Sequence, residues 1–272
     1  MILNEKSQED KMKGLATATN SLEVNPFGSL QDWNRHLIAK VGQQVALIER
    51  MNRLKRFLPT QIAETILNSD DANLFESHRR EITAVFLDLR GFTAFSDSAE
   101  PEEVMALLKN YHGEMGKLIL KFNGTLEHFA GDGMMVFFND PIPCEDHAEK
   151  AVCMGLEMRD KAKELRTGWL KNGCDLDLGI GVAAGYAVVG NIGFEGRMDY
   201  AAVGNVTNLA ARLCGAAKGG QILTNQRTLS KIENLVETEP LEELHLKGFV
   251  RPVRAFNIVN LKPNGDSRER GC

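Results

Sequence analysis

The spacing of apolar residues predicts regular strands and helices from about residue 80 onward. Residues 81–88 (EITAVFLD) form an apolar run that ends in an aspartate, which is typical of a buried strand. Residues 101–122 place apolar side chains three or four positions apart, which predicts a helix with Pro101 in its first turn. Together these runs predict a strand that leads into a long helix.

The next segments continue this alternation. Two short β runs, 125–128 and 134–138, flank the sequence FAGDG and predict a hairpin. A second helix is expected over 145–169, a strand over 175–184, and a glycine-rich hairpin over 185–200. The order strand, helix, hairpin, helix, strand predicts an α+β fold with a ferredoxin-like βαββαβ core. A third helix from about Asn205 and further C-terminal strands with one more helix, within 221–259, complete the prediction.

An N-terminal helix is predicted before this core. Helix-forming residues dominate 31–57, and a short helix follows Pro59. An apolar seam with alternating steps of three and four runs along the first helix, and a polar Asn52 falls at its next position; its apolar members are Ile38, Val41, Val45 and Ile48. This seam predicts a short parallel coiled coil, and the alternative is an amphipathic helix that lies on its own domain.

Charge and composition exclude several classes of function. Acidic residues outnumber basic residues by 37 to 32, so the formal charge is −5 and gives no general attraction to nucleic acid or to anionic membranes. No apolar stretch approaches the roughly 20 residues that a membrane helix needs, and the polar start lacks the apolar core of a signal peptide. The five cysteines form no C-x-x-C pair. We therefore expect a soluble cytoplasmic protein without a zinc site and without nucleic-acid or membrane partners.

Two aspartates stand where strands end or turn. Asp88 closes the apolar strand, and Asp132 lies between two glycines at the tip of the predicted hairpin. On a ferredoxin-like sheet these points can lie side by side, and two carboxylates there would bind two divalent cations, Mg²⁺ or Mn²⁺, together with substrate phosphates. Taken singly, Asp88 also suits a strand-end cap and Asp132 an Asp-Gly turn. The turn formed by Gly91, Phe92 and Thr93 offers backbone N–H groups for phosphate oxygens.

A second polar pair follows in NVTNLAARL. Asn208 and Arg212 are four residues apart, so they share one face of a helix. An arginine there can meet charge that develops on a phosphate, while an asparagine orients a sugar. The alternative interpretation is an exposed polar edge of the helix.

Four segments, FLDLRGFT, EHFAGDGMM, DYAAVGNVTNLAARL and LHLKGF, occur in this order, and with them the region from about 80 to 259 resembles the catalytic domain of class III adenylyl and guanylyl cyclases. The resemblance implies a head-to-tail homodimer with two active sites at its interface. One subunit would supply the metal-binding Asp88 and Asp132 and the backbone carbonyl of Leu89. The other would supply the transition-state residues Asn208 and Arg212, and Lys247 resembles the lysine that contacts the terminal phosphates.

The base pocket departs from the family pattern. Adenylyl cyclases usually carry Lys with Asp or Thr at two positions that here read His128 and Ala201, and guanylyl cyclases usually carry Glu with Cys or another small residue. A histidine ring can donate to adenine N1 or accept from a base amine, according to its tautomer. His128 also suits a cross-strand surface position.

The expected function is an adenylate cyclase that converts ATP into 3′,5′-cyclic AMP and pyrophosphate. The alternatives are a guanylate or pyrimidine nucleotide cyclase and a non-catalytic regulatory module with the same fold. A diguanylate cyclase is disfavoured because no GG(D/E)EF string occurs. We expect a flexible segment at 1–28, a helical dimerisation or signalling segment at 29–79, the catalytic domain at 80–260 and a flexible tail at 261–272. We expect either a stand-alone enzyme or one whose separate regulatory partner acts through the N-terminal helix.

Overall fold

The computed structural model describes residues 29–68, 75–171 and 173–263. The chain divides into two compact units between Phe57 and Leu58, and each unit is described by itself. The expected flexible segment 1–28 lies outside the described residues, and so does residue 264 onward of the expected tail.

The first unit contains the predicted N-terminal helix, α2 (Leu30–Leu54), followed by the 3₁₀ turn η1 (Lys55–Phe57). Helix α2 begins at Ser29, whose hydroxyl oxygen accepts a hydrogen bond from the backbone N–H of Asp32 at 3.2 Å. The four apolar seam residues are between 49% and 72% exposed. A helix with these side chains in water has an apolar seam available for a partner strand, and the coiled coil stays a prediction.

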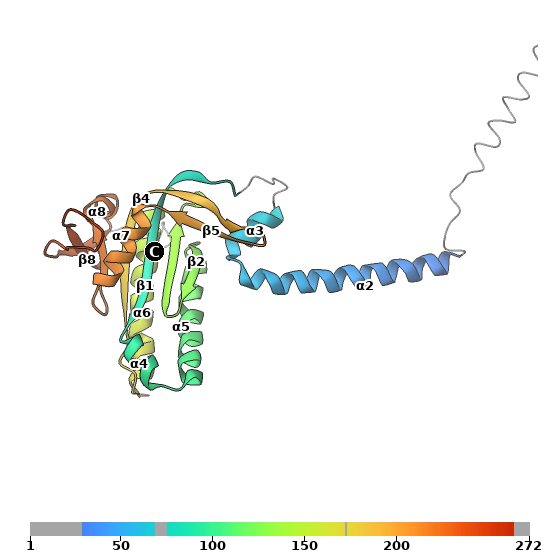
Figure 1. Cartoon of the computed structure of the whole chain (residues 1–272), viewed down its shortest axis with the longest axis horizontal. Coiled ribbons are helices and arrows are strands. Elements are labelled where there is room, and N and C mark those ends of the chain that lie inside the picture. The colour runs from blue at the N-terminus through green and yellow to red at the C-terminus, as the bar shows by residue number, and fades with distance from the viewer. Residues whose placement is uncertain (1–28, 69–74, 172, 264–272) are drawn as a thin grey trace, which may run out of the picture. The chain divides into compact units, whose positions relative to one another are not determined.

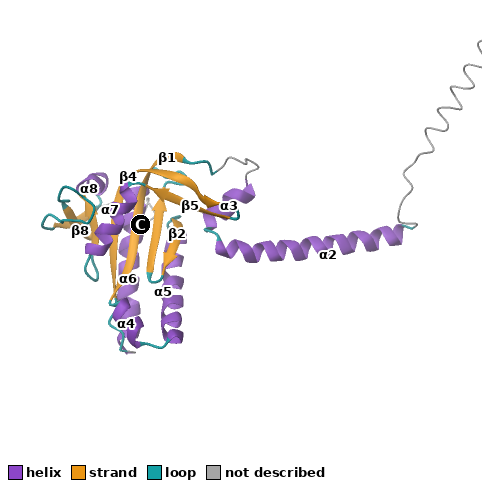
Figure 2. Cartoon of the chain, in the orientation of Figure 1, coloured by secondary structure: helices purple, strands orange, loops and turns teal. Residues whose placement is uncertain are grey.

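The second unit carries an eight-stranded sheet (Figures 1 and 2). Its strands follow the order β2-β3-β1-β4-β6-β8-β7, with β5 paired to β4. The strands are β1 (His78–Arg90), β2 (Thr125–Ala130), β3 (Gly133–Phe138), β4 (Asp177–Phe194), β5 (Arg197–Val203), β6 (Ile222–Asn225), β7 (Val236–Pro240) and β8 (Ala255–Leu261). The helices are α3 (Thr60–Asn68), α4 (Phe92–Ser98), α5 (Pro101–Lys121), α6 (His147–Lys171), α7 (Asn205–Ala216) and α8 (Gln226–Ile232).

The predicted ferredoxin-like core is confirmed. Strand β1 lies between β3 and β4 and is antiparallel to both, and β2 lies outside β3. Helices α5 and α6 run along one face of the sheet (Figure 1), and their apolar side chains pack with Val85 and Leu87 of β1. The alternate residues Ile82 and Ala84 face the opposite core, which includes side chains of α7. The period of two along β1 therefore separates two apolar layers.

Helix α7 packs unusually close to β4. A Cβ atom at Gly181 would lie 2.2 Å from the carbonyl oxygen of Ala210 and 2.2 Å from the backbone nitrogen of Cys214. Only a residue without a side chain therefore fits at position 181, and this glycine fixes how α7 sits on the sheet.

Two elements differ from the sequence prediction. The strand expected to end at Ala184 continues as β4 to Phe194, because it stays paired with β1 as far as Val189 and with β5 from Val188 onward. The hairpin turn therefore comes only at Glu195 and Gly196, before β5. The short helix α4 was not predicted, and it follows Gly91, whose φ of 86° favours glycine.

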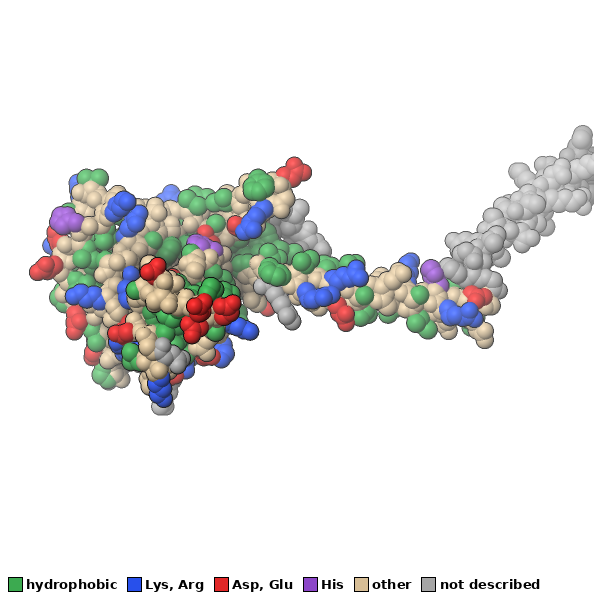
Figure 3. Space-filling view, turned by 60° about the horizontal axis from the view of Figure 1, so that its bottom comes forward, with side chains coloured by type: hydrophobic (Ala, Val, Ile, Leu, Met, Phe, Trp, Pro, Cys, Tyr) green, Lys and Arg blue, Asp and Glu red, His purple; other side chains and the backbone are tan. Residues whose placement is uncertain are grey.

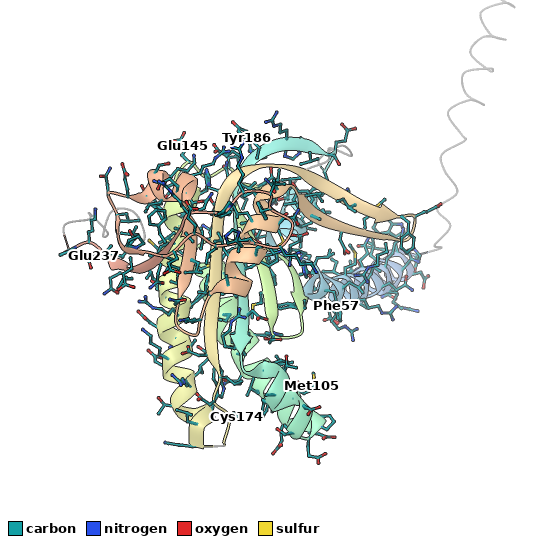
Figure 4. The ribbon with its side chains drawn as sticks, turned by 60° about the vertical axis from the view of Figure 1, so that its left-hand side comes forward. Phe57, Met105, Glu145, Cys174, Tyr186 and Glu237 are labelled. Atoms are coloured by element: carbon teal, nitrogen blue, oxygen red, sulfur yellow. The ribbon has the colours of Figure 1, made fainter. Side chains whose placement is uncertain are left out.

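Strand β4 spans the whole length of the sheet. Figure 4 shows Tyr186 on β4 at one end of the unit and Cys174, in the connection from α6 to β4, at the other end. On the face drawn in Figure 3, acidic and basic side chains are interspersed over the sheet unit. Among the described helices, none has the length and apolar character required to cross a membrane.

Candidate active site

The two aspartates singled out in the sequence lie side by side at the junction of β1 with the β2–β3 turn. Strand β1 pairs Leu87 with Met134 of β3, so Asp88 comes next to Gly133, where a Cβ atom would lie 3.8 Å from Asp88 Oδ1. Asp132 occupies the turn itself, and its Oδ2 accepts a hydrogen bond from the backbone N–H of Leu89 at 3.0 Å. Sheet pairing thus brings together carboxylates that are 44 positions apart in the chain.

The environment of Asp132, which includes the Asp88 carboxylate, changes how readily Asp132 ionises. Burial, and after it the nearby Asp88 carboxylate, raise the pKa of Asp132 to about 6, while the N–H of Leu89 acts in the opposite direction. Arg90 Nη2 lies 3.2 Å from Asp88 Oδ2 and also donates to the carbonyl oxygen of Cys214 at 3.0 Å. One arginine therefore offsets only part of the repulsion within the pair.

The donor set fits divalent cations of the hard type. Carboxylate oxygens are the ligands that Mg²⁺ and Mn²⁺ prefer, and a bound dication would relieve the repulsion that raises the pKa of Asp132. In the part of the chain that the structure describes, no group of three or more His, Cys, Asp or Glu side chains could hold a metal ion. The two carboxylates would therefore need backbone, water or substrate oxygens to complete the coordination.

A histidine of helix α5 contacts the turn that carries Asp132. The ring nitrogen Nε2 of His112 lies 3.0 Å from the carbonyl oxygen of Gly131, and the ring stacks on Phe129 of β2 at 4.6 Å. Tyr111 is fully buried, and both aspartates act to raise the pKa of its hydroxyl. The sequence analysis predicts a helix over 101–122 but does not single out Tyr111 or His112, because their contacts with the turn cannot be inferred from helical periodicity.

Asn208 and Arg212 do share one face of α7, as their spacing predicts. Both are exposed, whereas Val206, Ala210 and Leu213 are buried. Within the described chain, no hydrogen bond or ion pair joins Asn208 or Arg212 to either aspartate. The structure therefore brings the two aspartates together but leaves the α7 pair pointing into solvent.

Of the remaining candidate phosphate contacts, Gly91, Thr93 and Lys247 are exposed. Gly91 precedes α4, and its carbonyl accepts from the backbone N–H of Phe95 at 3.1 Å. Thr93 is exposed in the first turn of α4, and Phe92 is half-buried against the α5–α6 core. Lys247 is exposed in the connection between β7 and β8, next to the buried Leu246.

The two base-pocket positions lie on β2 and β5, which are not paired with each other in the sheet. His128 is exposed on β2 and Ala201 is half-buried on β5. A side chain that the sequence analysis did not single out, Glu127 of β2, connects these strands, because its carboxyl group accepts a hydrogen bond from the backbone N–H of Ala202. Strand β2 is thereby joined to β5 at the residues adjacent to both positions.

A buried network holds the residue before Ala201. The hydroxyl of Tyr200 donates to the carboxylate of Asp140, which is only 2% exposed and also lies 2.7 Å from Nε2 of His78. Asp140 additionally lies 3.5 Å from Arg80 Nε, so it is paired in a place where an unpaired carboxylate would be costly. Through Asp140 the network links Tyr200 of β5 to His78 and Arg80 of β1.

The fold and the aspartate pair together define a ferredoxin-like domain with an acidic, oxygen-donor site at a strand end. A comparison with protein families finds a match to the adenylate and guanylate cyclase catalytic domain over residues 75–260. Because this match covers more than half of the chain, the chain belongs to that family.

Individual relatives agree with this assignment. Adenylate cyclase 1 of Rhizobium meliloti is 26% identical over 267 residues, which are 94% of this chain and 40% of that protein, so the chain spans less than half of that relative. The crystal structure of the adenylyl cyclase CyaB from P. aeruginosa is 40% identical, with a TM-score of 0.67, and the match covers 69% of this chain and 98% of that one. The guanylyl cyclase Cya2 is 36% identical, with a TM-score of 0.66 and coverage of 70% and 97%.

Proposed function

We propose that this chain is an adenylate cyclase that converts ATP into 3′,5′-cyclic AMP and pyrophosphate, with 80–260 as its catalytic domain. The observation that carries the proposal is the convergence of Asp88 and Asp132 at one point of the sheet, in a chain of the cyclase family. A non-catalytic module would have no need to hold two carboxylates close together at the expense of a raised pKa.

Asp88 and Asp132, with the carbonyl of Leu89, would hold two cations, Mg²⁺ or Mn²⁺. When bound, they would favour deprotonation of the ribose 3′ hydroxyl and neutralise phosphate charge. Arg212 stabilises the charge that develops on the α-phosphate, and Asn208 orients the ribose for in-line attack. The backbone at Gly91, Phe92 and Thr93 and the ammonium of Lys247 contact the phosphates that leave as pyrophosphate.

The proposed enzyme acts as a homodimer in which each site is shared. In one chain Asn208 and Arg212 face solvent without contacting the aspartates, which is the arrangement expected if they complete the site of a second copy. The β4–β5 hairpin also exposes large apolar side chains, among them Ile192, Phe194 and Met198. Apolar side chains gathered on a projecting hairpin favour contact with a partner.

The base is assigned to adenine, and guanine or a pyrimidine is the alternative. Both an adenylyl and a guanylyl cyclase structure resemble this chain at similar identity, so similarity does not decide the base. Incubation with each of the four nucleoside triphosphates and Mn²⁺, with cyclic products identified by mass, tests the proposal. Cyclic AMP as the main product supports it, cyclic GMP or a cyclic pyrimidine nucleotide moves it to the alternative, and no product from any of them favours the non-catalytic module.

The substitution His128→Lys is expected to raise the ratio of kcat/KM for ATP over GTP. The reason is that lysine is the residue which adenylyl cyclases carry at this position, and the ratio measures differential transition-state binding. Steady-state rates with both nucleotides provide the measurement. An unchanged ratio would show that His128 is a surface residue of the hairpin that does not contact the base.

Removing the N-terminal helix is expected to weaken dimerisation. A chain that starts at about Pro59 lacks the exposed seam of α2, so its specific activity should fall at a higher protein concentration than that of the intact chain. The measurement is specific activity against dilution for both proteins. Equal activity down to the same dilution would show that α2 does not hold the dimer together. Contact with a regulatory partner would then be the remaining proposed role of α2.

A further inference from the structure

Three buried side-chain atoms of the described residues have no hydrogen-bond partner, and all three belong to the site region. They are Arg90 Nε, Tyr111 Oη and Glu127 Oε2. Arg90 and Tyr111 border the two aspartates, while Glu127 lies in the base-pocket region. Buried polar atoms without a partner are rare in folded proteins, so each is a candidate for contact with a missing ligand.

A β-bulge brings the Glu127 side chain to this place. Strand β2 pairs Leu126 with Val136 and His128 with Met135, so Glu127 has no opposite residue on β3. A bulge redirects the side chain of the extra residue, and bulges are frequent next to active sites. Here Glu127 reaches β5, and its carboxyl group accepts a hydrogen bond from the backbone N–H of Ala202. Its Oε2 atom is buried and has no hydrogen-bond partner.

The carboxyl group of Glu127 has little to stabilise its charge. Its pKa is raised to about 7, mainly by burial and in smaller part by the carboxylate of Asp199, while the N–H of Ala202 acts in the opposite direction. A carboxyl oxygen that is buried without a partner destabilises the folded chain, and a ligand that donates a hydrogen bond to it removes this cost.

Glu127 supplies a polar group beside a base-pocket position that has none. Ala201 has no polar side-chain atom, and the Glu127 carboxyl group lies against the adjacent residue Ala202. We propose that Glu127 determines base specificity, with its Oε2 accepting a hydrogen bond from the exocyclic amine of adenine. In this chain the polar group that reads the base is therefore on β2 and not on β5. This inference rests on the proposed cyclase function.

The test combines a change in the Glu127 side chain with removal of the amine from the nucleotide, so that the coupling between the two groups is measured. Wild type, Glu127→Gln and Glu127→Ala are each assayed with ATP and with purine riboside triphosphate, which lacks the amine. Wild type should prefer ATP by about tenfold or more in kcat/KM, because a missing partner leaves a buried polar group unpaired. In Glu127→Ala the preference should fall to about one. In Glu127→Gln the side-chain amide donor faces the amine, so ATP should lose more than the analogue.

Control and contrary outcomes separate this inference from the function on which it rests. Glu145→Gln, the same chemical change at an exposed residue before α6 (Figure 4), should leave the preference unchanged. If ATP and the analogue lose the same factor in both Glu127 variants, the residue only supports β5 and the inference is wrong. If wild type turns over neither nucleotide, the proposed function fails, and the same cycle is then read on equilibrium binding of the two nucleotides. The same three proteins are also assayed with GTP and with inosine triphosphate, which lacks the amine of guanine. If the Glu127 substitutions remove a preference for GTP over inosine triphosphate and not a preference for ATP, the base that Glu127 contacts is guanine and the inference is wrong.

Discussion

The substitutions Asp88→Asn and Asp132→Asn are each expected to reduce metal-dependent turnover to less than about a tenth of the wild-type rate. Each removes a charged oxygen ligand of the proposed cations, and the lost transition-state stabilisation of several kcal/mol corresponds to more than tenfold in rate. Pyrophosphate release with saturating Mn²⁺ is the measurement. A variant that keeps more than about a tenth of the rate would contradict the metal hypothesis.

The same variants are expected to stay folded. The pKa of Asp132 is raised by burial and by Asp88, so in the absence of metal its ionised form opposes folding once the pH exceeds its ordinary pKa of 3.8. At neutral pH the uncharged amide that Asp132→Asn introduces should therefore keep or raise the midpoint of thermal unfolding in metal-free buffer. Asp97→Asn, at an exposed position of α4, is the matched control and should change neither the rate nor the midpoint.

Much of this fold could be predicted because its signals are local. The apolar run of β1 and the helical period of α5 are each visible in a single window, and their order determines the ferredoxin-like core. Helix α4 has only seven residues, which is too short for an apolar period to show. The glycines at 185, 190 and 193 suggest a hairpin, yet β4 passes through them because its pairing with β1 continues past the first and its pairing with β5 includes the other two.

In the candidate site, too, the residues that lie in local sequence features could be predicted and those that depend on tertiary packing could not. Asp88 and Asp132 could be proposed from sequence because a strand end and a hairpin tip are local features that one sheet brings together. Glu127 could not, since its significance depends on a bulge in β2 and on a hydrogen bond from Ala202, which lies 75 positions further along the chain. The His112 contact with Gly131 is also a product of packing, because α5 must first lie against β2.

The shared-site hypothesis leads to the prediction of rescue between two inactive chains. Asp88→Ala and Asn208→Ala homodimers are each expected to be inactive, because every site contains one lesion. In a mixed dimer one site collects both lesions, while the other combines the aspartates of the Asn208→Ala chain with the Asn208 of the Asp88→Ala chain. With random pairing about half of the dimers are mixed, so co-expression should recover about a quarter of wild-type activity.

The control for this experiment is a direct check that mixed dimers form. Two different affinity tags, one on each chain, allow mixed dimers to be isolated, and the isolated mixed dimer should reach about half of the wild-type rate because one of its two sites is intact. Co-expression of Asp88→Ala with Asp132→Ala should recover nothing, since both lesions affect the same half of the site and every combination leaves each site with a damaged aspartate pair. A site built within one chain predicts no rescue in either combination, because exposed Asn208 and Arg212 would then act on the aspartates of their own subunit. Mixed dimers that are present and inactive would therefore assign all four residues to a single chain.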